Sequence, residues 1–260
     1  EASEKSFEAQ VLGNGFWQCA FGRGVRYLAP PACYRILFPL LLHPAKSSAE
    51  YMVPETSTGD WWRYQVLRAL VYWVGLLILT LGVCLPTALL TAAIFGATIR
   101  YDYWSSGVEL LAVACVLAGG VLDWHWGYLL ALGVVLGSGR ETLPFLALLG
   151  TPQALGLACG AAIGHLVVRL YAKTGEQWKG TLDYAVPMWR TNLGSIRGDH
   201  GPWAQFHVGI YLLVGGLAVM TAPLLAVPLI LVTAVIARID EPRVLTMLAP
   251  FAAMTVLRYV

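Results

Sequence analysis

The residues best suited to chemistry are Arg140 and Glu141, which stand between two short apolar runs and are flanked by Gly137, Gly139 and Pro144. Charges within membrane segments cost a few kcal/mol each, so they are functional candidates. The glycines allow a break in a helix, and an arginine near a helix start could hold an anionic group beside backbone N–H donors. An internal Arg–Glu pair at a turn between helices explains the same residues. Both interpretations remain open.

A second charged cluster consists of Arg238, Asp240, Glu241 and Arg243, just before the last apolar run. Pro242 suits the first turn of a helix, and acidic residues beside it complement the positive end of the helix dipole. We therefore expect a short charged loop. The alternative is that Arg243 reaches a lipid phosphate at the membrane surface.

The third cluster lies near the N-terminus, where Arg23, Arg26 and Arg35 are interspersed with Tyr27 and Tyr34. Basic and aromatic residues together suit lipid head groups. They suit an ordinary helix at the membrane surface equally well.

Two histidines fall in apolar runs, because His165 lies inside one and His207 opens another. Such residues on facing helices could ligate a haem or a chlorin-type pigment, but no defined spacing pairs them. A hydrogen bond to a neighbour is the simpler prediction for His165. Asp199 and His200 stand together in a loop-like run that could serve acid–base chemistry.

The five cysteines form no paired C-x-x-C pattern, so they predict no metal site. Cys84, Cys115 and Cys159 lie in apolar runs, where they are most simply small core residues. Cys19 and Cys33 could form a disulfide if the N-terminal region faces an oxidising compartment.

The composition places these residues in a membrane. Of 260 residues, 58% are hydrophobic and only 12% are charged, half the share that a soluble domain carries. Disordered chains are polar and poor in aromatic residues, so disorder is excluded as well. The net charge of +2 gives no indication of a nucleic-acid partner. The sequence predicts an integral membrane protein in contact with membrane lipids.

The expected fold is an all-α, polytopic bundle over residues 64–260, preceded by an extramembrane or interfacial region over 1–63. A spanning helix needs about 20 apolar residues. The apolar runs fit seven or eight membrane helices, several of them short, and a polar loop is expected at about 171–205. The runs are 66–84, 85–99, 107–122, 127–136, 143–149, 152–170, 208–222, 223–237 and 244–260.

Three stretches resemble GT-C-type polytopic membrane glycosyltransferases. FEAQ (7–10) followed by YLAPPACYRILFPLL (27–41) is similar to the first large extracytoplasmic loop of that class. GSGRETLPF (137–145) resembles a helix start common in the class, and DEPRVLTMLAP (240–250) resembles a run near its end. The order and rough spacing of the three agree with the class.

The resemblance implies a membrane bundle that takes a sugar from a polyprenyl-phosphate donor and transfers it at the extracytoplasmic face. In that class an acidic residue in the first loop is the general base, and basic residues hold the leaving phosphate. Arg140, Arg243 and Arg35 would contact the phosphate, with Glu141 in the same site. Glu8 is the candidate base, although it matches no family motif. We expect the chain to begin inside this loop, beyond the first membrane helix.

Three functions follow as hypotheses. The first is a GT-C-like transferase in a prokaryotic-type plasma membrane. The second is a non-catalytic accessory or structural subunit of a larger membrane protein complex, favoured by the missing catalytic acid and by short helices that need burial against protein. The third is a transporter that uses Arg140 and Glu141 at a broken helix.

Overall fold

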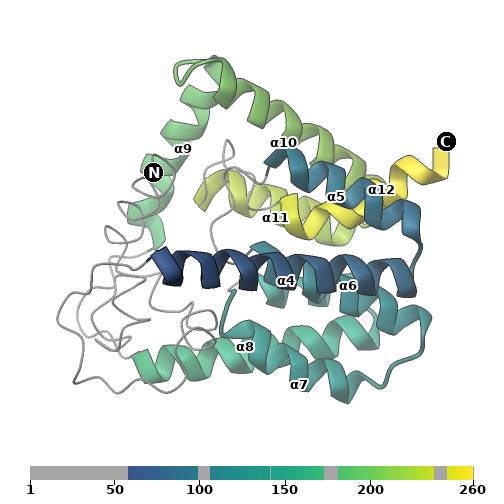
Figure 1. Cartoon of the computed structure of the whole chain (residues 1–260). Helices are drawn as coiled ribbons and strands as arrows, with labels where there is room; N and C mark the ends of the chain where they lie inside the picture. The colour runs from purple at the N-terminus through teal and green to yellow at the C-terminus, as the bar shows by residue number, and fades with distance from the viewer. Residues whose placement is uncertain (1–57, 99–105, 141, 173–180, 237–244, 260) are drawn as a thin grey trace.

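The computed structural model describes residues 58–98, 106–140, 142–172, 181–236 and 245–259 (Figure 1). These ranges contain only helices, which confirms the all-α prediction for this part of the chain. The elements are α4 (Thr58–Gly82), α5 (Leu85–Thr98), α6 (Ser106–Val121), α7 (Trp126–Gly137), the 3-10 helix η4 (Leu143–Leu149), α8 (Pro152–Ala172), α9 (Thr181–Arg197), α10 (Pro202–Thr221), α11 (Pro223–Ile236) and α12 (Leu245–Tyr259).

Prolines mark several helix starts. Pro86, Pro152, Pro202 and Pro223 each stand at the first or second residue of a helix, where the missing N–H has no intrahelical partner to lose. The connection before each of these helices is very short, so consecutive helices fold back on one another. The first described helix, α4, begins at Thr58 and therefore crosses the boundary predicted between residues 63 and 64.

Close contacts give the directions of the helices. Gly75 of α4 lies against Leu110 of α6, and Gly82 lies against Ala118, so α4 and α6 run in parallel. By the same reasoning α7 and α8 run in parallel, because Gly156 faces Trp126 and Gly164 of α8 faces Val134. Helices α4 and α6 thus begin at the end of the bundle where α7 and α8 finish (Figure 1).

Helices α7 and α8 approach each other backbone to backbone. A Cβ atom added to Gly160 would lie 2.0 Å from the carbonyl oxygen of Leu130, and one added to Gly133 would lie 2.2 Å from that of Leu157. Only glycine fits at such positions. Small residues spaced four apart are typical of helix pairs that associate in membranes, where close backbones favour Cα–H···O contacts.

The short apolar run predicted at 143–149 forms the 3-10 helix η4. Seven residues at about 2 Å each cover only about 14 Å. Because α7 and α8 are parallel, the chain must return from the end of α7 to the level of its start before α8 begins, and the segment that contains η4 makes this return. It packs on α6, α7, α8 and α11, with Leu143 and Leu146 buried and Leu148 exposed.

The loop expected at about 171–205 is also partly wrong, since it contains helix α9 and the start of α10. The polar composition of this segment favoured a loop, although residues 181–197 form a helix. Trp189 and Ile196, seven residues apart, share the exposed face of α9, while Asn192 and Ser195 face the bundle.

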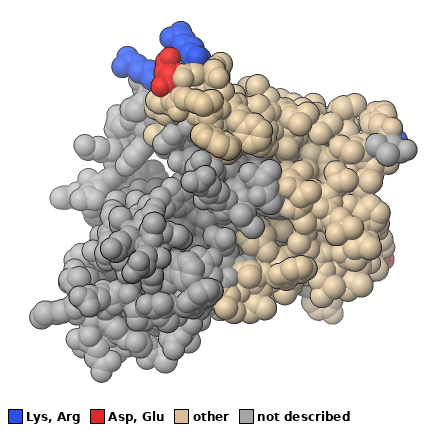
Figure 2. Space-filling model, turned by 45° about the horizontal axis from the view of Figure 1, so that its top comes forward, with Lys and Arg blue, Asp and Glu red and all other residues tan. Residues whose placement is uncertain are grey.

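The outer surface of the bundle is apolar. Leucine, valine and aromatic side chains of α4, α5, α8, α10 and α11 point outward; Leu81, for example, is 73% exposed. On the face in Figure 2, charged side chains occur only at the margins of the described surface. By length and composition, α10 is the one described helix that could cross a membrane alone; the other apolar helical stretches are shorter.

Candidate functional site: a buried Glu–Arg–Thr cluster

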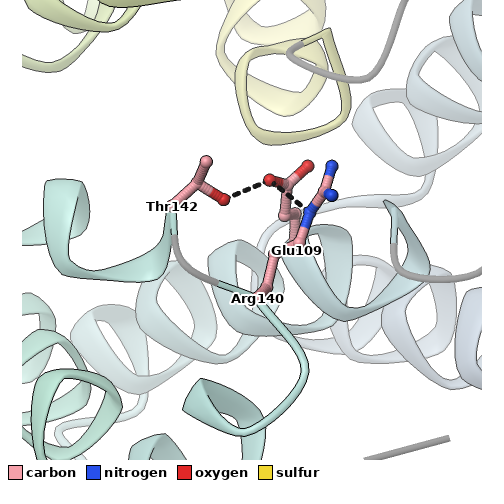
Figure 3. Close-up of polar contacts among 3 residues, drawn as sticks. All are labelled: Glu109, Arg140 and Thr142. Carbon is pink, nitrogen blue, oxygen red and sulfur yellow. Dashed lines mark hydrogen bonds and ion pairs between the residues drawn. The ribbon is translucent and has the colours of Figure 1, made fainter. Parts of the chain in front are cut away.

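The predicted residue Arg140 belongs to a buried cluster with Glu109 and Thr142 (Figure 3). Glu109 lies in the first turn of α6. Arg140 follows the end of α7, and Thr142 directly precedes η4. The cluster therefore joins the start of α6 to the connection between α7 and η4.

A single carboxylate oxygen holds the cluster together. The Nε of Arg140 donates a hydrogen bond of 2.9 Å to Oε1 of Glu109, and the hydroxyl of Thr142 donates to the same oxygen. The arginine and glutamate side chains are 3% and 2% exposed. Burial on this scale makes the pair part of the interior.

Each charge in the pair offsets part of the free-energy cost of burying the other. An isolated charge in a medium of low dielectric constant is costly, whereas a hydrogen-bonded opposite charge offsets much of that cost. Glu109 also lies in the first turn of α6, where the helix dipole favours a negative charge. The ion pair thus fixes the segment that follows α7 against the start of α6.

The structure thus shows an internal Arg–Glu pair in which the partner of Arg140 is Glu109, an acid that was not among the predicted residues. Glu141 lies outside the described residues. Glu109 was not among the predicted site residues, although it is the only acidic residue within the apolar run 107–122. An isolated acid in such a run, together with an arginine at a helix break, would have suggested the pair.

Most of the other predicted site residues lie outside the described part of the chain. They are Glu8 and Arg35, the N-terminal residues Arg23 and Arg26, the loop residues Arg238, Asp240, Glu241 and Arg243, and the cysteines Cys19 and Cys33. Their proposed roles remain predictions.

Asp199 and His200 lie in the turn that ends α9. The N–H of Asp199 donates to the carbonyl of Gly194 at 2.9 Å, and that of Gly198 donates to Ser195 at 3.3 Å. With Gly198 at φ 89°, these bonds form a Schellman motif, which closes the end of a helix. Both side chains are exposed, and their predicted acid–base role remains a prediction.

His165 and His207 lie on helices that pack in different parts of the bundle. His165 is half-buried on α8, which packs mainly on α7 and η4. His207 is buried on α10, which packs on α12 and α11, and its ring contacts Phe206 edge-on at 5.7 Å. Within the described ranges, no three metal-ligating side chains gather in one place.

A second set of polar contacts joins α9, α10 and α11. The hydroxyl of Tyr211 donates to the carbonyl of Ile230 at 2.9 Å and lies 2.7 Å from the hydroxyl of Thr233. Asn192 of α9 donates from Nδ2 to the carbonyl of Ala234 at 2.8 Å. This carbonyl belongs to the last described turn of α11.

Helices α10 and α12 are joined in the same way. The hydroxyl of Thr255 bonds to the carbonyl of Leu217 at 2.7 Å and to the hydroxyl of Thr221.

No family model, curated protein or solved structure matches this chain. The described geometry thus consists of buried polar contacts that fix helices to one another, with Glu109 and Arg140 as the charged members.

Proposed function

We propose that this protein is an integral membrane helix bundle whose apolar outer surface contacts lipid or other membrane proteins. The observation that carries the proposal is that many large apolar side chains point outward from the bundle. Trp73, Tyr128 and Leu224 are between 68% and 74% exposed, and similar side chains surround them. Soluble monomers rarely expose contiguous apolar patches larger than about a few hundred Å².

The charged residues support the same proposal. Among described side chains, the exposed charges are those of Asp123, Arg190, Arg197, Asp199 and Arg258. All lie in α9 or near a helix end, whereas Glu109 and Arg140 are buried as a pair. Alkaline carbonate treatment of membranes that contain the full chain tests this. We expect the chain to stay with the lipid and to need detergent for release; its release by carbonate alone would contradict membrane integration.

Within the membrane, the function that we propose is that of a non-catalytic structural subunit of a larger membrane protein complex. Support comes from short helices with exposed apolar faces. Helix α7, with 12 residues, rises about 18 Å, well below the hydrocarbon thickness of about 30 Å. Such helices need a thinned bilayer or neighbouring protein. The pairing of Arg140 with Glu109 supports a structural role for that charge as well.

Native mass spectrometry of the gently extracted protein tests the subunit proposal. We expect the chain to co-purify with larger partners at fixed stoichiometry. A lone chain that carries a polyprenyl-phosphate lipid would contradict the proposal and favour the transferase instead.

The transferase is the second candidate, supported by the order of the motifs at 7–41, 137–145 and 240–250. In this role, the chain would act at the extracytoplasmic face of a prokaryotic-type plasma membrane. Arg140 would exchange the carboxylate of Glu109 for the phosphate of the polyprenyl-phosphate sugar. The double variant Glu109→Leu/Arg140→Met removes both charges together. If it folds and still turns over the donor, Arg140 has no role as a phosphate contact.

A transporter is the third candidate, and η4 is the observation that favours it. Irregular backbone inside a membrane bundle is tolerated where protein or a water-filled path surrounds it, and broken helices hold the substrate in several transporter folds. Substrate-dependent flux in proteoliposomes that contain the full chain would support this function, and its absence for a panel of anions would contradict an Arg140-based path.

A further inference from the structure

Helix α9 differs in direction from the rest of the bundle. It runs across the axes of α4 and α6 rather than along them, and it lies at the end of the bundle where those helices begin (Figure 1). It leads through the turn at 198–201 into α10, the helix long and apolar enough to span a membrane. If α10 crosses the bilayer, α9 lies at its surface.

The inner face of α9 is fixed by polar contacts. Asn192 and Ser195 are buried, and Asn192 bonds to the end of α11. The Schellman motif at Gly198 then sets the angle at which the chain enters α10. These contacts determine which side of α9 points away from the bundle.

The outer face of α9 carries two adjacent stripes. Trp189 and Ile196 are about half exposed and form an apolar stripe, because residues seven apart lie on one side of a helix. Arg190 and Arg197, each one residue further, form a basic stripe beside it and are exposed, and one acidic residue, Asp199, is exposed two residues beyond Arg197. An apolar stripe flanked by arginines is typical of helices that lie in a membrane interface.

The start of α10 continues this surface. Trp203 and Phe206 are exposed there, and their rings meet edge-on at 6.1 Å. Tryptophan is enriched at the level of lipid head groups, where its ring is partly in an apolar and partly in a wet environment. The surface of α9 and the first turns of α10 therefore combine basic and aromatic side chains at one level.

We infer that this surface binds the head groups of anionic phospholipids. Arg190 and Arg197 hold the lipid phosphates through charge-assisted hydrogen bonds, while Trp189 and Ile196 enter the boundary between head groups and acyl chains. The complementary charge and the continuity with the apolar outer surface identify lipid, rather than an acidic protein segment, as the occupant. The inference rests on the proposed membrane integration but not on any proposed activity.

The test is lipid retention by the purified full chain, measured by native mass spectrometry during titration with phosphatidylglycerol or phosphatidylcholine. We expect wild type to prefer phosphatidylglycerol. Because each arginine near an anionic surface contributes about fivefold in affinity, Arg190→Gln/Arg197→Gln should weaken its binding by about 25-fold. Arg258→Gln is the matched control, since Arg258 is also exposed but lies in the last turn of α12, at the opposite end of the bundle. It should leave retention unchanged.

Equal retention of both lipids by wild type, or unchanged retention in the double variant, would overturn the inference. Displacement of the lipid by inorganic phosphate at equal concentration would mean a site for free phosphate instead. Binding of an acidic peptide in place of lipid would also overturn it. Release of the chain by carbonate is the separate result that would contradict membrane integration itself, so the two failures are distinguishable. Matching circular dichroism spectra verify that the variants fold.

Discussion

Replacing Arg140 with methionine is expected to destabilise the bundle strongly, because it removes the ion pair that Arg140 makes with the buried carboxylate of Glu109. Two unit charges about 4 Å apart attract by about 4 kcal/mol at an effective dielectric constant of about 20. The pair here is bonded at 2.9 Å and almost fully buried. Removing one member of such a pair typically costs about 3–5 kcal/mol. A chain unfolded in a membrane finds some replacement partners, so we expect a cost of about 2–5 kcal/mol.

The double variant Glu109→Leu/Arg140→Met provides the decisive comparison. Because it removes both charges, it should recover most of the stability lost in the single variant, apart from about 1 kcal/mol for the hydroxyl bond of Thr142. Unfolding in mixed micelles, followed by far-ultraviolet circular dichroism, measures each free energy. Arg258→Met is the exposed control and should change it by less than about 0.5 kcal/mol.

Three outcomes would refute this reasoning. Arg140→Met and Arg258→Met could have equal effects, which would mean that the buried pair contributes nothing. The double variant could also be as unstable as the sum of its two single variants, which would mean that the two charges are not coupled. If Arg140→Met retains full stability but loses a bound polyprenyl-phosphate, Arg140 serves the ligand rather than the fold.

The packing and polar contacts of the other helices lead to further predictions. Gly160→Leu forces α7 and α8 apart and should cost about 1–3 kcal/mol in the same unfolding assay; Gly216→Ala, where the added Cβ meets nothing within 4 Å, should instead stabilise the protein slightly. Equal effects would contradict the close α7–α8 contact. Asn192→Ala should speed amide exchange at the end of α11 without changing exchange in α6. Unchanged rates would show that the bond from Asn192 to the carbonyl of Ala234 does not stabilise the end of α11. Thr255→Val should cost about 0.6–1.7 kcal/mol, and no loss would mean that the bond to Leu217 is replaced.

Helix positions were largely predictable, because apolar composition and prolines at helix starts are local signals. The predicted starts near Pro152 and Pro223 agree with α8 and α11. The identity of η4 was not predictable, since seven apolar residues look alike whether they form a 3-10 or an α-helix. Its form depends on the parallel arrangement of α7 and α8, a tertiary property. Helix α9 was missed because its buried side is polar, which inverts the pattern used to recognise helices in soluble proteins.

The candidate site was predicted only in part. Arg140 was recognised because a charge at a helix break is conspicuous, but its partner is 31 residues earlier in the chain. Sequence proximity favoured Glu141 for that role. Pairing across that distance depends on α6 and α7 folding back on each other, so the sequence can suggest the pair but only the fold establishes it.

The return of the chain through η4 also has a consequence for synthesis. One of the helices that pack on η4 is α11, which ends at Ile236. Ribosomes add about 5–20 residues per second, so roughly 90 further residues and about 4–17 s separate the completion of η4 from that of α11. During this interval the segment cannot reach its final surroundings. Under the proposed membrane integration, we therefore expect α7, η4 and α8 to leave the insertion machinery as an unfinished unit that matures only when the later helices arrive.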